Sequence, residues 1–502
     1  MVLNGSAARQ GQIVDIGDGL IMRWSTSADA ENVSKLMSDC FRFLPSGRQL
    51  PDDQIPGENE VLANAARRLL KGTNACMSST DYALVENTQA GPSQNPIVAA
   101  VSLHEIPGYY GSVRLTYGKP ELIACDPQFR SRGLIRKLMM EMIHPESDRR
   151  GHVLQMIFGI GYFYREMPDI SWIPKLGEGE KEQYTLRQAT LDDIPFLVRL
   201  STNENLYVDA EMGSAYDEKY WRWLVHDVYQ NPVGRYDGHR ITTIIRDETS
   251  GRDIGFNQTA FVYSFLWFKF ALEKGEPLHK ILHPVMRQML AIGNKQCMTY
   301  REQELAMKAA KGESTDDVRK PQLSSMRLAL GPKHPAMTLV QSKLAPEEVL
   351  PVIPLYTRVF DYSAFILKVA PTLEARLAQS VFAGATAKLQ LNFFKKLEGM
   401  SASGLEVVFE KGKIVSASPW KKPSPEAKVE EVRKRKAAGL PALTIYAGEF
   451  HPLTFTSLLT GYRSFMDLAW SNADTNVDNE DSRYFLEALF PKVSHDFDLF
   501  IW

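Results

Sequence analysis

Cysteines are scarce in this 502-residue sequence, and long apolar runs are absent. The four cysteines, at positions 40, 76, 125 and 297, show no paired spacing, which fits a reducing compartment better than a disulfide framework. No basic start leads into an apolar stretch, and nowhere do about eighteen apolar residues follow one another. Secretion and membrane spanning are therefore not expected, and we predict a cytoplasmic protein.

An excess of charge of one sign is also missing. Lysine and arginine number 58 against 60 aspartates and glutamates, a formal net charge of -2, so we expect no general attraction for nucleic acid. With 44% hydrophobic and 24% charged residues, the composition is that of an ordinary globular protein. The length exceeds what one hydrophobic core usually organises, which predicts roughly two to four domains.

A short stretch near the N-terminus recurs once at a constant offset. In both copies a strand leads through Ser/Thr and Asp, which cap helices well, into apolar residues at helical period. The matching pairs, each 164 positions apart, are Arg23 and Arg187, Thr26 and Thr190, Asp29 and Asp193, Val33 and Leu197, and Leu36 and Leu200. We therefore expect two similar units, which begin near residues 20 and 184.

The first unit alternates predicted strands with turns and one helix. Strands are expected at 81–86 and 97–104, separated by a turn rich in glycine, proline, serine and asparagine, and again at 121–125. A basic, glycine-containing turn and a helix with one apolar face follow, and a last strand is expected at 152–158. This succession predicts an α/β sandwich with a mixed sheet.

The residue pattern changes near residue 362 and predicts a third domain, of the α+β class. Short strands are expected at 387–394, 405–410, 413–418 and 442–446, followed by a helix over 455–459 and 464–470. Residues 421–436 are charged and almost free of large apolar side chains, which indicates a solvated loop or an exposed helix.

The basic turn after the central strand of the first unit carries the clearest chemical signal. A helix N-terminus presents free backbone N–H groups, and Gly133 lets the backbone approach an anion such as a pyrophosphate. Arg130 and Arg132 add positive charge, and the open edge of the strand can hydrogen-bond a pantetheine arm as an added strand would. Backbone groups of Ile123 and Cys125 can then hold a thioester carbonyl, with an N–H as oxyanion donor. The alternative is a basic surface turn that only starts a helix.

The residues of this turn resemble a known cofactor signature. The acetyl-CoA signature of the GCN5-related N-acetyltransferase superfamily reads Arg/Gln-x-x-Gly-x-Gly/Ala, and the matching residues here are Arg130, Ser131, Arg132, Gly133, Leu134 and Ile135. Ile135 departs from the small final residue. The form Arg-x-Arg-Gly-Leu-hydrophobic-Arg is similar to the enhanced intracellular survival (Eis) family of aminoglycoside acetyltransferases. The resemblance implies that these residues bind acetyl-CoA as a cosubstrate, without a metal.

Members of that family join an active acetyltransferase domain, a degenerate second copy and a sterol-carrier-like domain. The resemblance therefore implies an N-terminal extension over 1–19, an active domain over 20–178, a degenerate domain over 184–361 and a sterol-carrier-like domain over 362–502. In the second copy the corresponding turn, 273–277, carries two glutamates that would face the phosphates, so we expect it not to bind CoA. Bacterial relatives form hexamers, which also implies self-association.

Two further residues are implied to act in catalysis. Tyr164 stands in a segment similar to the family's, in which a tyrosine acts as general acid, and the apolar tail that ends at Trp502 is like the family's, whose terminal carboxylate lies in the active site. A phenol, with an ordinary pKa of about 10, can donate its proton to a departing thiolate. The carboxylate of Trp502 would serve as general base if burial raised its pKa from about 3.5. Tyr162 competes for the acid role, and simple packing of these aromatic residues is the alternative.

Other patterns are weaker. His279 and His283 share a helix face at a spacing that zinc enzymes use, but the glutamate after the first histidine and a third ligand are missing, so we expect no metal site. Loops that shape the substrate pocket are expected at 43–65 and 104–118.

The sequence thus predicts an acetyl-CoA-dependent N-acetyltransferase that acts on the amines of a cationic small molecule or on lysine side chains. The alternative is a non-catalytic protein that binds acyl-CoA or an apolar ligand. The sequence Met-Pro-Asp at 167–169, where the family has a Phe-Gly-aromatic pattern, keeps that alternative open.

Overall fold

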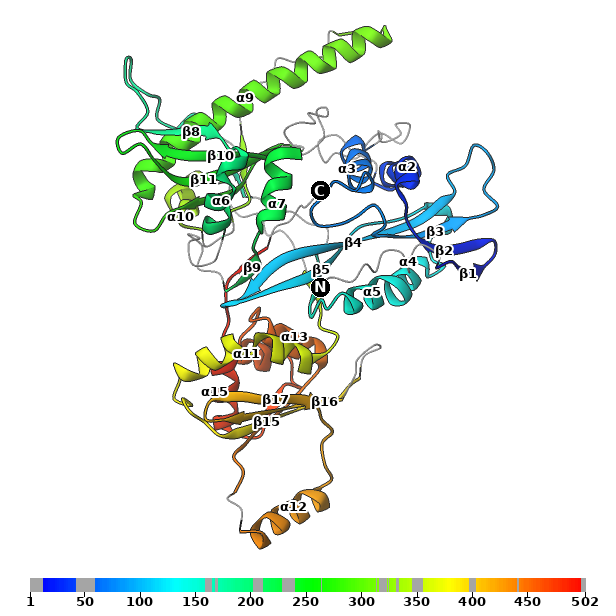
Figure 1. The fold of residues 1–502 in the computed structure, drawn as a ribbon, viewed down its shortest axis with the longest axis vertical. Coiled ribbons are helices and arrows are strands. Elements are labelled where there is room, and N and C mark those ends of the chain that lie inside the picture. The colour runs from blue at the N-terminus through cyan, green and yellow to red at the C-terminus, as the bar shows by residue number, and fades with distance from the viewer. Residues whose placement is uncertain are drawn as a thin grey trace.

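In the part of the chain that the structure describes, three β-sheets of nine, six and five strands form the framework, and helices cover each of them (Figure 1). Each sheet mixes parallel with antiparallel strands, which confirms the predicted α/β class. The computed structural model describes residues 12–41, 59–158, 165–167, 170–201, 211–227, 240–262, 264–312, 314–315, 323, 325–330, 334–344, 355–396, 403–439 and 442–497.

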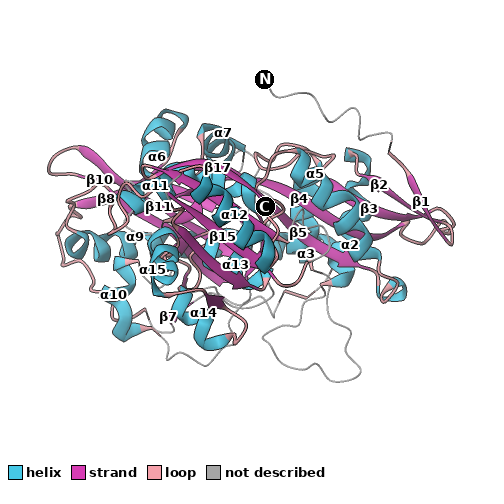
Figure 2. Ribbon diagram, turned by 90° about the horizontal axis from the view of Figure 1, so that it is seen from below, coloured by secondary structure: helices cyan, strands magenta, loops and turns pink. Residues whose placement is uncertain are grey.

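The first sheet has the strand order β1-β2-β3-β4-β5-β6-β14, with β9 and β20 joined to it through β4. Its strands are β1 (Val14–Gly17), β2 (Leu20–Trp24), β3 (Tyr82–Asn87), β4 (Ile97–Tyr110), β5 (Val113–Cys125), β6 (Gln155–Phe158), β9 (Met212–Ser214), β14 (Leu355–Arg358) and β20 (His495–Asp496). Helices α2 (Ala30–Cys40) and α3 (Glu60–Leu70) pack on one face. A continuous helical segment covers the other (Figure 2), made of α4 (Leu134–Lys137), a π-helical stretch (Leu138–Ile143) and α5 (His144–Arg149).

The second sheet has the strand order β7-β13-β12-β11-β10-β8. Its strands are β7 (Arg165–Met167), β8 (Tyr184–Gln188), β10 (Arg240–Asp247), β11 (Arg252–Val262), β12 (Ser264–Leu272) and β13 (Met326–Leu328). Its helices are α6 (Ile194–Leu200), α7 (Glu218–Arg222) with a π-helical extension (Trp223–Asp227), α9 (Leu278–Lys311) and α10 (Pro335–Val340). The far end of α9 extends well beyond the sheet (Figure 1). Among the described residues, no helix is both long and apolar enough to cross a bilayer.

The third sheet has the strand order β17-β16-β15-β18-β19. Together with its helices it gives the C-terminal part the predicted α+β class. Its strands are β15 (Ala387–Phe393), β16 (Gly404–Glu410), β17 (Lys413–Pro419), β18 (Ile445–Phe450) and β19 (Asn476–Val477), and its helices are α11 (Tyr362–Ala378), α12 (Pro425–Ala437), α13 (Pro452–Leu459), α14 (Phe465–Ser471) and α15 (Glu480–Leu489). The charged segment is indeed an exposed helix, α12, without a buried residue. One predicted helix is instead two, because Gly461 takes a positive φ of 67° between α13 and α14.

The internal repeat of the sequence encodes the same local structure twice. After β2, Thr26 and Asp29 form a capping box, and the Asp29 carboxylate accepts a 2.7 Å hydrogen bond from Arg23. After β8, Thr190 and Asp193 repeat the capping box, and Arg187 donates to Asp193 at 2.6 Å. The apolar partners of both copies, Val33 with Leu36 and Leu197 with Leu200, are buried. The match between the two segments is therefore structural.

Removal of either capping carboxylate should destabilise the protein. Asp29→Asn removes one of the two carboxylates, Asp29 and Glu86, that pair with the mostly buried guanidinium of Arg23, and it weakens the cap, so the free energy of unfolding should fall by about 2 kcal/mol at pH 7. Burial would raise the pKa of Asp29, but hydrogen bonds from Arg23 and Thr26 outweigh burial and hold the pKa below its ordinary value. The difference from wild type should therefore be complete above about pH 4 and shrink as the pH falls further. Urea unfolding at several pH values measures this difference in the free energy of unfolding. The control is Asp192→Asn, which should change the free energy of unfolding little because Asp192 is exposed.

The two larger sheets also share their topology. In the first, β5 runs parallel to β6, and the register of β4 and β5 shifts so that Leu122 and Ile123 face one residue of β4. Leu122 has a φ of 47° in this bulge. In the second, β12 runs parallel to β13, and a register shift in β11 and β12 makes Phe268 the extra residue. Both sheets thus contain a bulge in the strand that precedes the long helical segment.

Each of the two sheets takes its outermost strand from the other half of the chain. Strand β7 follows β6 in sequence but pairs with β13 of the second sheet. Strand β14 lies in the second half of the chain but pairs with β6 of the first sheet. The predicted units 20–178 and 184–361 therefore each lend a strand to the other's sheet, and the predicted N-terminal extension, 1–19, contributes β1. The domain boundaries themselves stay a prediction.

A long hairpin replaces one of the predicted loops. The strands expected at 97–104 and 121–125 are only the ends of β4 and β5, and residues 104–118 are mostly strand instead of a loop. Pro107 and Gly108 lie within β4, and Gly108 is where β9 and the Tyr117 ring come close to the backbone. The other expected loop, 43–65, contains the start of α3, and residues 43–58 lie outside the described part.

Candidate functional site

The basic turn after β5 is built as an exposed, open helix N-terminus. Asp126 caps a short 3-10 turn (Pro127–Phe129) by accepting from the N–H of Gln128. Ser131 and Gly133 then take positive φ values of 63° and 72°, and Gly133 is the N-cap of α4. Among the described residues, apart from its chain neighbours and the backbone of its own helix, no atom lies within 4 Å of the position that a Cβ of Gly133 would occupy. The first N–H groups of α4 are therefore open to an anion.

Each of the two arginines of the turn makes one contact with a neighbouring residue of the same segment. Arg130 donates from Nε to the carbonyl of Cys125 at 3.2 Å, and the Arg132 guanidinium lies 5.1 Å from the centre of the Phe129 ring. Both side chains are exposed, as is Ser131, so their charge faces solvent. The apolar residues of the segment, Leu134 and Ile135, pack against the core under α4. The unusual Ile135 thus has a packing role that a small residue would leave unfilled.

Strands β5 and β6 separate just before this turn. Among the described residues they pair only at Gly118 and Gln155, so the end of β5, residues 122–125, has no strand partner there on the side away from β4. The N–H of Asp126 bonds to β4, and alternation then directs the N–H groups of Ile123 and Cys125 toward that free edge. The thiol of Cys40, whose pKa burial raises to about 11, accepts a hydrogen bond from the Cys125 N–H. A pantetheine bound along this edge would take the place of that thiol.

A row of polar side chains that the sequence did not predict lies on the α2–α3 face of β4 and β5. This polar stripe consists of Ser102, His104, Lys119 and Glu121. Lys119, almost fully buried, pairs with Glu121 at 2.6 Å. Opposite Lys119 lies the buried ring of His104, whose pKa burial and the Lys119 charge lower to about 3, so the ring is neutral. Ser102 donates to the Glu121 carbonyl at 2.7 Å, so His104 donates from Nε2 to Ser102. The polar residues that alternate with apolar ones in 102–105 and 119–121 were the sequence pattern that could have predicted this polar stripe.

The C-terminal segment reaches the same face of the sheet. The ring of Phe497, the last described residue, packs edge-on against Tyr117 at 5.6 Å, and Tyr117 bonds to Ser214 at 2.7 Å. Tyr117 is two residues before Lys119 on β5, so both side chains lie on this face. The predicted catalytic residues Tyr164 and Trp502, and the competitor Tyr162, lie outside the described residues.

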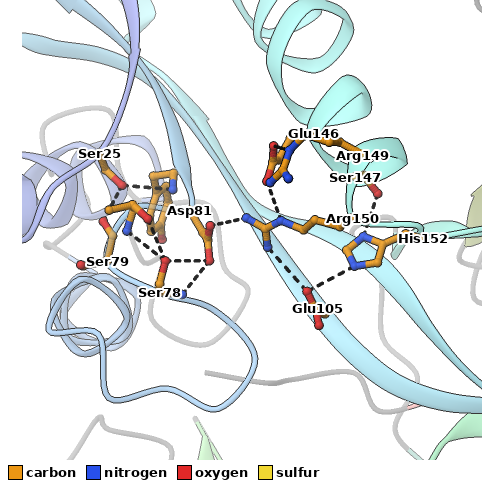
Figure 3. A network of polar contacts seen from close by, with 12 residues as sticks. Ser25, Ser78, Ser79, Asp81, Glu105, Glu146, Ser147, Arg149, Arg150 and His152 are labelled. Atoms are coloured by element: carbon orange, nitrogen blue, oxygen red, sulfur yellow. Dashed lines mark hydrogen bonds and ion pairs between the residues drawn. The ribbon is translucent and has the colours of Figure 1, made fainter. Parts of the chain in front are cut away.

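A second polar network holds the point where β5 and β6 separate (Figure 3). On the α5 face, His152 bonds to Ser147 at 2.9 Å and lies 3.5 Å from the Glu105 carboxylate. Arg150 links Glu146 of α5 to Asp81 at the start of β3. A side chain on Gly118 would collide with both Ser147 and His152. A hydrogen bond from His152, with the charges of Arg150 and Lys219, holds the pKa of Glu105 below its ordinary value.

The acidic turn of the second sheet is neutralised within the protein. Glu273 pairs with Arg199 at 2.5 Å and with Arg252 at 3.7 Å, and Glu276 pairs with Arg252 at 2.7 Å. The two carboxylates face arginines, in contrast to the cationic, open turn of the first sheet. The expectation that this turn does not bind CoA stays a prediction.

The histidines on α9 make no metal site with other described residues. His283 packs edge-on against the Trp172 ring, with ring centres 5.7 Å apart. Among the described residues, no group of three or more histidine, cysteine, aspartate or glutamate side chains is placed to hold a metal ion.

Comparison with solved structures shows the class of fold, that of the GCN5-related N-acetyltransferases. A GCN5-related N-acetyltransferase from Kribbella flavida matches with a TM-score of 0.53 and 12% identity over 96% of this chain and 98% of that one. A probable N-acyltransferase of unknown function from Enterococcus faecalis V583 matches with a TM-score of 0.57 and 12% identity, over 96% and 100%. No protein-family model and no curated protein matches the sequence significantly.

The narrower likeness, to the Eis family, rests on the residues of the turn and the tail. Eis1 from Mycobacterium abscessus is matched with a TM-score of 0.48 and 11% identity, over 95% of this chain and 98% of that one. At 12% identity, the matches from Kribbella flavida and Enterococcus faecalis establish a shared fold and no more.

Proposed function

We propose that this protein is an acetyl-CoA-dependent N-acetyltransferase that acetylates an amine of a cationic small molecule or of a lysine side chain. The observation that carries the proposal is the continuity of the free edge of β5 with the open, cationic N-terminus of α4. An extended pantetheine arm can add to the edge of β5 as a further strand would, and a pyrophosphate can bind the N-terminus of α4. The shared fold with N-acetyltransferases supports an acyltransferase role in general.

Different residues of the turn would bind acetyl-CoA through different groups, some through side chains and others through backbone N–H groups. Arg130 and Arg132 would pair with phosphate oxygens, while Ser131, Gly133, Leu134 and Ile135 would present backbone N–H groups. The N–H groups of Ile123 and Cys125 would hold pantetheine and the thioester oxygen, where negative charge develops during attack. No described residue fills the space beside Gly133, so the turn has room for this ligand.

The reaction requires one proton to leave the amine and one to reach sulfur. As the amine nitrogen bonds to the acetyl carbon and the C–S bond breaks, we assign the proton on sulfur to Tyr164 and proton removal from nitrogen to the carboxylate of Trp502. Five residues follow Phe497, and an extended chain of that length spans at most about 17 Å. The same distance, about 17 Å, separates Tyr117 from the bulge at Leu122 along β5. A fully extended tail is therefore long enough to span this distance, which supports the assignment of the carboxylate.

One added residue after Trp502 should test this assignment. A glycine appended there moves the carboxylate by about 3.5 Å, beyond hydrogen-bond reach of the amine, so kcat should fall about 100-fold. The dissociation constant for acetyl-CoA should stay within about twofold, because the cofactor turn is unchanged. The matched control is a glycine added before Met1. Unchanged turnover would remove the carboxylate from the mechanism.

The whole proposal is tested by binding and turnover measured separately. Titration calorimetry with acetyl-CoA should show one site per chain, and CoA release should rise with at least one member of a panel of polyamines, aminoglycosides and lysine peptides. Absence of binding would overturn the proposal. Binding without turnover of any amine would instead favour the non-catalytic, acyl-CoA-binding alternative.

A further inference from the structure

The second unit contacts the C-terminal segment through a lysine beside its own β-bulge. Lys269, on β12, is only 9% exposed, and its Nζ lies 3.4 Å from the Asp496 carboxylate. The same Nζ lies 5.4 Å from the centre of the Tyr216 ring, over its face. Asp496 is itself largely covered, with 21% of its side chain exposed. Charges that are this far removed from water depend on their partners.

Strand β20, which carries Asp496, is held from other directions as well. It runs parallel to β9, with His495 opposite Met212 and Asp496 opposite Gly213. Strand β9 in turn pairs with the end of β4 in the first sheet. His495 Nε2 lies 2.8 Å from the carbonyl of Thr460, which belongs to the third, C-terminal part of the fold. All three parts of the molecule therefore meet at these two residues.

The backbone at this point leaves no room for a side chain. A Cβ on Gly213 would collide with the Asp496 carbonyl and would lie 2.8 Å from the Tyr109 hydroxyl. Just beyond Asp496, Phe497 packs against Tyr117, on the face that carries Lys119 and Glu121. The position and direction in which the chain leaves β20 are thus set by the pairing with β9 and by the ion pair with Lys269.

We propose that the second unit acts as a docking platform for the C-terminal segment, with Lys269 as a positioning residue that acts through Asp496. The bulged strand of the second unit, β12, supplies the cation, Lys269. The glutamates of its acidic turn pair with Arg199 and Arg252 of the same unit. The second unit thereby holds Phe497 against Tyr117, on the face of the first sheet that carries the polar stripe. The proposal rests on the proposed function, because it assigns this segment to the acceptor side of that site.

The test is a charge-swap cycle in the full-length chain. Lys269→Met and Asp496→Asn should each lower kcat about 10-fold while the dissociation constant for acetyl-CoA stays within about twofold. The double exchange Lys269→Asp with Asp496→Lys should recover a substantial part of kcat, which a purely structural loss would not do. Exposed Lys274→Met is the matched control, because Lys274 lies in the turn that follows β12 and, among the described residues, takes no part in the pairing of β20 with β9.

A second readout reports on the segment itself, independently of turnover. Trimming by carboxypeptidase should be slow in wild type and about 10-fold faster in Lys269→Met and in Gly213→Ala, which displaces β20 without removing either charge of the ion pair. If the wild type binds no acetyl-CoA but trimming still accelerates, the docking stands and the proposed function fails. Equal trimming rates in all variants, or a loss of acetyl-CoA binding equal to the loss of kcat, would overturn the docking.

Discussion

Replacing Arg130 and Arg132 together by alanine should weaken acetyl-CoA binding by about 100-fold. Each guanidinium would form a charge-assisted bond to a phosphate, worth about 1.5 kcal/mol at such an exposed site, and the loss of both bonds corresponds to about 100-fold in the dissociation constant. The fold should be unaffected, because both side chains are exposed and Arg130 contributes only a 3.2 Å bond to the Cys125 carbonyl. Titration calorimetry at fixed ionic strength measures the change.

The control for this result is a cation on the same helix but outside the turn. Lys137, at the end of α4, faces Glu141 at 3.9 Å, and Lys137→Ala should change the dissociation constant less than twofold. The affinity of the wild type should also fall with added salt, and the double variant should lose most of that dependence. Unaltered binding in the double variant would mean that the turn is only a basic surface feature.

A chain that ends after residue 178 should fail to fold into a stable unit. This fragment lacks β14, which covers the edge of β6, and β9, which covers the end of β4, and it leaves β7 without β13. Exposed strand edges and an uncovered core favour association over cooperative folding. We expect no sigmoidal urea transition by circular dichroism and loss of soluble protein.

Co-expression of the two halves of the chain shows whether the fragment fails to fold because it lacks the exchanged strands or because it is unstable for another reason. Co-expression of residues 1–178 with residues 179–502 should restore a soluble complex, because the exchanged strands β7 and β14 can pair again. A fragment that unfolds cooperatively on its own with the stability of the intact chain would contradict this account. Such a result would mean that the first sheet is complete without the second half.

Much of the candidate site was accessible from local sequence because its structure is local. Helix caps, turns and charge at a helix N-terminus depend on residues within a few positions, so the two capping boxes and the open Gly133 follow the patterns that predicted them. The same holds for the arginine-containing turn of the first sheet and the glutamate-containing turn of the second. The α/β class follows from the order of strands and helices.

What the sequence by itself determined, then, is the repeated strand–cap–helix segment, the basic turn and the expectation that only one of two similar units carries it. The tertiary structure decided which strands complete each sheet, how far β4 and β5 extend, and that Lys119 with Glu121 and Lys269 with Asp496 become buried pairs. The reason is physical. Such pairings join residues that are distant in sequence, and their stability comes from packing and exclusion of water in the assembled fold, which local propensity does not encode.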